Sequence, residues 1–136
     1  MKPMKLDRNF DDQPLNDVVL NLTQHNGTPE QDVVEPLDKG TVKEMLTFSS
    51  LPSHEDILDR ASKLAVLASN ELMEADNRAA MIGGAPYLMP ALVDALKAYG
   101  IKPLFAFSER VSEDKHMPDG TVQKVNVFKH IGWIEA

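Results

Sequence analysis

The sequence predicts an α/β fold with three layers, in which a mostly parallel sheet ends in an antiparallel hairpin at the C-terminus. The first observation is a strand, helix, strand pattern, because the apolar segments 79–82 and 104–107 flank an amphipathic helix. Two strands joined through a helix in this way run parallel, and a parallel sheet carries helices on its faces. The second observation is the turn signal Met117–Gly120, which joins Ser108–Glu113 to Thr121–Ile134 as a hairpin.

The length and composition predict one globular domain. The chain has 136 residues, of which 43% are hydrophobic and 26% are charged. These values are usual for a soluble protein, and the length suits a single core. Residues 1–16 are polar and contain Pro3 and Pro14, which predicts a flexible N-terminal arm that is able to reach a partner subunit. The single α/β domain is therefore expected over residues 17–136.

The composition also argues against several classes of function. The net charge is −7 and the sequence shows no basic patch, so long DNA or RNA is not expected as a partner. The chain has no cysteine, which excludes disulfides, thiolate metal sites and a cysteine nucleophile. The N-terminus lacks the apolar run of a signal peptide, and no apolar segment has the length of a membrane span. We therefore expect a cytoplasmic protein that does not contact a membrane.

The first half of the domain is expected to begin with a strand over residues 17–23. Thr28 then has the features of a helix cap, since Pro29 follows it and Gln31 lies three residues on. That helix must be short, because residues 33–36 are apolar enough to form an edge strand that Pro36 closes.

Two further helices are expected before the βαβ unit. The first spans residues 38–48. The second begins after Ser53, which has Asp56 as its capping-box partner. Its apolar residues recur every three or four positions as far as about residue 75, which predicts one buried and one solvated face.

The helix of the βαβ unit has two candidate starting points. Either Pro86 or Pro90 suits the first helical position, and the sequence does not decide between them. Gly100 is expected to end this helix as a C-cap.

A ligand site is expected at the carboxyl edge of the sheet, where the loops of an open α/β sheet meet helix N-termini that favour anions. The predicted strands bring three segments to this edge. The candidate ligand-binding residues are Thr23, Gln24, Gly83, Gly84, Ala85, Ser108 and Arg110, with His25 as the candidate catalytic residue. Their hydroxyls, amide, backbone and guanidinium suit a small anionic ligand such as a nucleotide.

Each of these residues also has an ordinary structural interpretation. His25 follows a strand and is suited to act as a general acid or base near neutral pH, but it is equally a polar loop residue. Gly83–Gly84 lets a ligand approach the backbone closely, or is only a tight turn. Arg110 binds phosphate, or is a surface charge. Neither a dinucleotide fingerprint, a P-loop nor a His-rich metal motif is present, so we expect no metal and no cofactor.

Residues 20–31, LNLTQHNGTPEQ, resemble the opening of some small CRISPR-associated ring nucleases. Those chains begin with an apolar strand that ends in a Ser-His pair and is followed by a Thr-Pro-x-Gln helix start. Gln24 replaces that serine here, and Asn26–Gly27 differ in the connecting turn. The resemblance covers about a dozen residues of the chain.

The resemblance implies a CARF-like, Rossmann-like domain that binds cyclic oligoadenylate in a cleft at a homodimer interface. Cleavage would need no metal: a ribose 2′-hydroxyl attacks its adjacent phosphate and leaves a cyclic phosphate. His25 would position or deprotonate the hydroxyl, while the backbone N–H groups of Gly84 and Ala85, with Arg110, would stabilise the developing charge. The alternative is a non-catalytic module that binds a small ligand or a protein, with the apolar helix face Leu88–Leu96 and Trp133 as its contact surface.

Overall fold

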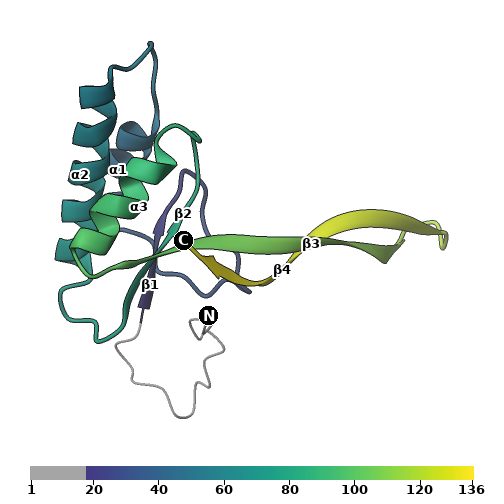
Figure 1. Ribbon diagram of the computed structural model, residues 1–136. Coiled ribbons are helices and arrows are strands. Elements are labelled where there is room, and N and C mark those ends of the chain that lie inside the picture. The colour runs from purple at the N-terminus through teal and green to yellow at the C-terminus, as the bar shows by residue number, and fades with distance from the viewer. Residues whose placement is uncertain (1–17) are drawn as a thin grey trace.

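The computed structural model describes residues 18–136, so the predicted N-terminal arm lies outside the described residues. The described chain folds as a mixed α/β structure with an open sheet and three helices (Figure 1). The elements are β1 (Val18–Leu22), α1 (Lys39–Leu46), α2 (His54–Glu71), β2 (Arg78–Ile82), α3 (Met89–Ala98), β3 (Lys102–His116) and β4 (Val122–Glu135). Among these helices, none has both the length and the apolar character needed to cross a bilayer.

The sheet has the strand order β1-β2-β3-β4. β1 pairs with β2 in parallel, and β2 pairs with β3 in parallel over Ala79–Met81 and Lys102–Leu104. β3 and β4 are antiparallel. The predicted βαβ unit and the predicted C-terminal hairpin are therefore both confirmed.

The prediction of three layers is not confirmed by the described residues. All three helices pack in one apolar cluster, with Leu20, Leu22, Ala80 and Ile82 on the sheet. The opposite face of the sheet forms a small cluster that is covered by Val33 and Trp133 instead of a helix. The strand order explains the arrangement: right-handed crossovers that move across a sheet in one direction leave their helices on the same face.

The N-terminal ends of α1 and α2 follow from their capping residues. Asp38 accepts a hydrogen bond from the backbone N–H of Thr41 at the start of α1. Ser53 and Asp56 form the predicted capping box, with both reciprocal bonds at 3.0 Å. α2 then buries Ala61, Leu64, Ala65 and Ala68 against the core.

The predicted helix start at Thr28 gives only a turn. The Gln31 side chain does accept from the backbone N–H of Thr28, at 2.9 Å, as a capping partner would. The next residue, Asp32, has a positive φ of 53°, which interrupts a right-handed helix. The segment then joins β1 through a single parallel bridge between Leu20 and Val34, so the predicted edge strand is reduced to one residue pair.

Neither of the two candidate prolines is the first residue of α3. The helix begins at Met89, with Pro90 in its first turn, and Gly100 adopts a φ of 71° just beyond its end. Leu88, Leu92 and Leu96 are fully buried. The prediction that this helix face serves as a partner surface is therefore wrong, because the face packs into the protein's own core.

β3 and β4 extend well beyond the rest of the sheet as a two-stranded hairpin (Figure 1). We call residues 105–134 the distal hairpin. A register shift between Phe107 and Ser108 leaves Ile131 as an extra residue in β4, and bulges of this kind increase twist. Several large apolar side chains of the distal hairpin are exposed, namely Phe107, Val122, Phe128, Ile131 and Ile134.

Candidate ligand-binding cleft

A cavity of about 550 Å³ lies at the carboxyl ends of β1 and β2. It is formed by the loop after β1, the turn after β2 and the adjoining part of β3. Its lining residues are Thr23, Gln24, His25, Asn26, Thr28, Gln31, Met81, Ile82, Gly83, Gly84, Phe105 and Ala106. We call this cavity the cleft. Its volume lies in the range of small-molecule sites, roughly 300–1,000 Å³.

Most of the predicted site residues line this cleft. Thr23, Gln24 and His25 reach it from the end of β1, while Gly83 and Gly84 reach it from the end of β2. The parallel pairing of the two strands explains why residues about 60 positions apart meet at one edge. Their roles as ligand-binding or catalytic groups remain predictions.

The other three predicted residues lie outside the cleft lining. Ala85 packs against the main core, and its carbonyl accepts from the backbone N–H of Leu88 at 3.0 Å. Ser108 and Arg110 lie farther along β3, in the distal hairpin. The guanidinium of Arg110 stands 5.6 Å from the centre of the Phe128 ring. A ligand confined to the cleft would therefore not depend on Arg110.

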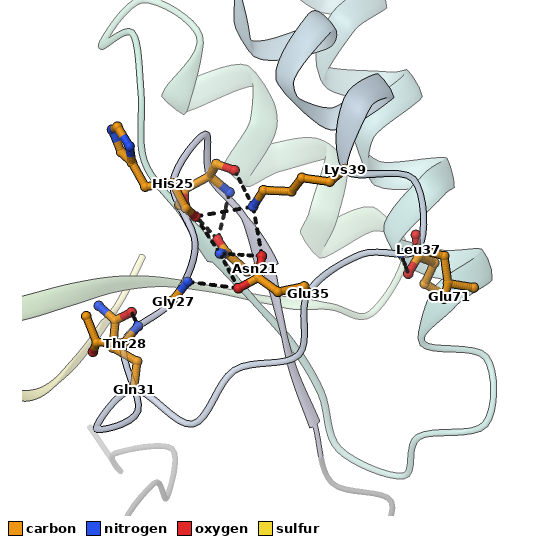
Figure 2. A network of polar contacts seen from close by, with 10 residues as sticks. Asn21, His25, Gly27, Thr28, Gln31, Glu35, Leu37, Lys39 and Glu71 are labelled. Carbon is orange, nitrogen blue, oxygen red and sulfur yellow. Dashed lines mark hydrogen bonds and ion pairs between the residues drawn. The ribbon is translucent and has the colours of Figure 1, made fainter.

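The loop after β1 rests on a network centred on Asn21, whose side chain is fully buried (Figure 2). The Asn21 amide nitrogen donates to the His25 carbonyl at 2.7 Å and to both carboxylate oxygens of Glu35 at 3.0 Å. Its amide oxygen accepts from the backbone and the hydroxyl of Thr23, at 3.0 and 2.7 Å. A buried amide with all these bonds fixes the path of the loop.

Lys39 and Glu35 complete the network. The Lys39 ammonium donates to the carbonyls of Thr23 and His25, at 2.9 and 3.2 Å, and to Glu35 at 2.9 Å. Burial alone would raise the pKa of Glu35, but bonds from the Gly27 N–H, Asn21 and Lys39 outweigh it, so the pKa of Glu35 is lowered. The carboxylate is therefore ionised when the network is intact.

This network orients His25 in a specific way. Its carbonyl is held by Asn21 and Lys39, while its imidazole points away from the network (Figure 2). His25 is exposed and lines the cleft. Among the described residues that line the cleft, it is the only histidine.

Two glycines are required by the geometry of the loops. A Cβ on Gly27 would overlap the Cγ2 atom of Val33, and the Gly27 N–H donates to Glu35 at 2.8 Å. Gly84 has a φ of 144°, a conformation that side chains disfavour. At their turning points, both loops therefore present backbone atoms and carry little side-chain bulk.

A second, more apolar hollow of about 710 Å³ adjoins the cleft. It shares Gly83, Gly84 and Phe105 with the cleft and continues along the start of α3, where Met89 and Val93 line it. Polar groups thus surround one part of this edge, and apolar groups surround the other. A ligand with an anionic part and a flat apolar part suits such a division.

The sequence analysis missed Asn21, Glu35 and Lys39. A signal for Asn21 existed, because it is the one polar residue in the buried strand VVLNL, and a buried amide needs partners. Glu35 and Lys39 carry no such signal, because charged residues in a loop are usually solvated. Only the fold shows that residues 21, 35 and 39 meet.

The chain was compared with protein families, with curated proteins and with solved structures. No curated protein and no solved structure matches the chain. Within residues 18–136 there is no group of three or more His, Cys, Asp or Glu side chains placed to hold a metal ion. A family model described as "Uncharacterized protein MJ1673 family" matches residues 17–134. The match covers most of the chain, and the protein therefore belongs to that family.

Proposed function

We propose that the protein binds a small anionic ligand of the nucleotide class in the cleft. The observation that carries this proposal is the convergence of two separate loops, residues 23–28 and 83–84, on one cavity of about 550 Å³. Both loops follow the carboxyl ends of parallel strands, the usual ligand edge of such sheets. A Rossmann-like relationship is part of the same proposal, and the parallel order β1-β2-β3 supports it.

The lining of the cleft suits the two parts of a nucleotide. The Gly83–Gly84 backbone and the side chains of Asn26 and Thr28 provide donors for phosphate or ribose oxygens. Phe105, Met81 and Ile82 provide an apolar surface for a base, and aromatic stacking on a base contributes about 1–3 kcal/mol. The overall charge of −7 opposes an anionic ligand at long range, so binding depends on the local donors of the cleft, and salt screens the repulsion over about 8–10 Å.

The enzymatic form of this proposal is metal-independent cleavage of a cyclic oligoadenylate. His25 would take the proton of a ribose 2′-hydroxyl, whose oxygen attacks the adjacent phosphorus while the 5′-oxygen leaves and receives a proton. The position of His25 in the cleft lining favours this role. Arg110 lies elsewhere, so its predicted part in charge stabilisation requires a ligand long enough to reach the distal hairpin.

The alternative is a module that binds the same ligand without turning it over. It is favoured by one observation: the side chains that hold His25 within residues 18–136 donate to its carbonyl, while its imidazole points away from the network (Figure 2), whereas general bases are commonly oriented by a second group. The catalytic and the non-catalytic proposals place the same ligand in the cleft and differ only in the role of His25.

A panel of cyclic and linear oligoadenylates, mononucleotides and inorganic phosphate tests the proposal. Binding is read by calorimetry, and turnover is read by chromatography with and without EDTA. The His25→Ala variant should keep affinity within about threefold and lose any turnover, whereas His54→Ala, at the start of α2 and outside the cleft lining, should change neither. A wild-type protein that binds no member of the panel would overturn the proposal.

Gly84→Val provides the matching test of binding. It adds bulk at the cleft and strains a φ of 144°, so affinity should fall by about tenfold or more. Gly100→Ala, just beyond the end of α3, is its control, because it strains a φ of 71° at a position outside the cleft lining. Equal loss of affinity in both variants would contradict the proposal.

A further inference from the structure

The outer edge of β3 is open over most of its length. β2 covers β3 only at Lys102–Leu104, and the rest of β3 pairs with β4 alone. In the part of the chain that the structure describes, no strand pairs with the other edge of residues 105–116. An open edge of this length is a ready template for another strand, and proteins usually cover or interrupt it.

The distal hairpin also lacks support on its faces. Phe107 is 49% exposed, Phe128 is 71% exposed and Ile131 is 54% exposed. A two-stranded ribbon of this kind is marginally stable in water unless it packs against something else. Both observations indicate that the distal hairpin has a partner.

The sequence of β3 identifies a second copy of the same strand as that partner. Residues 108–116 read SERVSEDKH. If two such strands pair antiparallel with Ser112 opposite the partner's Ser112, then Arg110 faces the partner's Asp114. In the same register Glu109 faces the partner's Lys115. Each contact occurs twice by symmetry, so four oppositely charged pairs form, and cross-strand pairs of opposite charge are stabilising.

Neighbouring symmetric registers lose this complementarity. Centring the pair on Val111 places Glu109 opposite the partner's Glu113. Centring it on Glu113 places two like carboxylates opposite each other. The charge pattern therefore favours one register over its nearest alternatives.

We propose that two copies of this chain form a two-fold symmetric dimer through the open edge of β3, with Ser112 at the centre. This interface is isologous, because the same strand is used on both sides. It joins the two hairpins into a four-stranded sheet with the order β4-β3-β3-β4.

The register has a consequence for the cleft. The pairing of β2 with β3 ends at Met81 and Leu104, and the cleft begins just beyond it, because Gly83 and Phe105 both line it. The partner's β3 would run along the same edge of β3 from which β2 has departed. The partner's β3 ends at His116, opposite Ser108, and the turn at residues 117–120 that follows it would lie beside Phe107. Each cleft would therefore be bordered by the hairpin tip of the other copy.

This dimer does not depend on what the cleft binds. It rests on the strand edge and its charges, whereas the proposed function rests on the lining of the cleft. The tests are accordingly separate: a dimer without nucleotide binding, or nucleotide binding by a monomer, would each overturn one proposal and leave the other standing.

Cysteine cross-linking tests the register directly. The chain has no cysteine, so a single introduced thiol reports one contact. Opposed residues in antiparallel strands have Cα atoms about 4.5–5.5 Å apart, within the range of a disulfide. Ser112→Cys should give a disulfide-linked dimer under mild oxidation. Ser108→Cys should not, because its two copies would be roughly 26 Å apart at 3.3 Å per residue.

A mixture of variants provides the positive control for that second position. Ser108→Cys should cross-link to His116→Cys when the two proteins are mixed, although neither cross-links to itself. The register would be overturned if Ser112→Cys gave no disulfide-linked dimer, or if Ser108→Cys alone gave as much of it as Ser112→Cys. A wild-type protein that is monomeric by light scattering at about 100 µM would overturn the dimer.

A charge exchange tests the same contact without thiols. Lys115→Glu should raise the dimer dissociation constant by about tenfold, because it places two pairs of carboxylates opposite each other. Glu109→Lys combined with Lys115→Glu should restore much of the affinity, since the opposite signs are exchanged. Lys63→Glu on α2 is the control for net charge and should leave the dimer unchanged. No recovery in the double variant would contradict the proposed pairing.

Discussion

The helical half of the molecule contains a core of fully buried apolar side chains, although Leu58 and Val66 on α2 remain partly exposed, whereas no residue of the distal hairpin is fully buried. In the first region Leu64, Leu92 and Leu96 have no exposed surface. In the second, Phe128 keeps 71% of its surface exposed. The two regions belong to one sheet, because β3 continues from the buried Leu104 into the hairpin.

The difference indicates what stabilises each region. Burial of apolar surface contributes roughly 25 cal/mol for each Å², so the helical half is stabilised mainly by its core. The distal hairpin depends on the backbone hydrogen bonds between β3 and β4 and on exposed side-chain pairs. Each such pair contributes little to stability. Substitutions in the two regions should therefore change the free energy of unfolding by different amounts.

Leu92→Ala should have the largest effect on stability. The side chain is fully buried between the helices and the sheet, and such truncations cost about 2–5 kcal/mol through lost transfer energy and the cavity left behind. Denaturant unfolding measures the loss. Ile131→Ala, in the distal hairpin, removes a side chain of the same size at an exposed position and should cost under about 1 kcal/mol. Similar losses in the two variants would remove the distinction between the regions.

Asn21→Ala should have the next largest effect. It removes the bonds from Asn21 to the His25 carbonyl and the Glu35 carboxylate, which keep their bonds from Lys39. A lost hydrogen bond costs about 0.5–1.5 kcal/mol, and about 1.5–3 kcal/mol where its partner is charged. It should also loosen the loop that forms one wall of the cleft, so hydrogen exchange at residues 23–27 should speed up. Asn126→Ala, on the exposed part of β4, is the matched control. Unchanged exchange in Asn21→Ala would show that the network does not hold the loop.

Acid should weaken the same network. The pKa of Glu35 is lowered from its ordinary value of 4.5 in the folded protein, so its ionised form contributes stability above that value. The contribution is lost as the pH falls through the folded pKa. The melting temperature of the wild type should therefore fall more between pH 6 and pH 3 than that of Glu35→Gln. Equal falls would mean that Glu35 does not contribute to acid sensitivity.

Lys124→Ala should have the smallest effect. Its ammonium lies 2.8 Å from Asp114, but the two side chains are 76% and 53% exposed. Exposed pairs of this kind contribute about 0–1 kcal/mol and are screened by salt. The unfolding free energy should change by less than about 1 kcal/mol, and the change should vanish at 1 M salt. A loss above 2 kcal/mol would show that the distal hairpin is more tightly supported than its exposure indicates.

The sequence predicted the elements well where a local signal was strong. The capping box at Ser53 and the turn at Met117–Gly120 both occur, because each is decided by residues that are neighbours in the chain. The helix expected after Thr28 did not form, although its capping contact did. Too few residues separate Thr28 from the bridge at Val34 for a helix to pay its nucleation cost.

The layering and the site were predicted less completely, for a different physical reason. Which face a helix covers depends on the strand order, and no local pattern determines that order. The cleft gathers the residues that follow β1 and β2, as predicted, but Ser108 and Arg110 continue along β3 because that strand does not end where its partner β2 ends. Asn21, Glu35 and Lys39 meet only through the fold.

The central claim is that the ligand edge lies at the carboxyl ends of β1 and β2, where the distal hairpin begins, and not on the outer part of that hairpin. Backbone amide shifts in a nitrogen-15 NMR spectrum, recorded while cyclic tetra-adenylate is added, test it most directly. The account predicts that the amides of His25, Gly83 and Gly84 shift with a common affinity, while Asp114 and Lys124 do not. Shifts confined to the distal hairpin, or no shifts with any nucleotide of the panel, would contradict it.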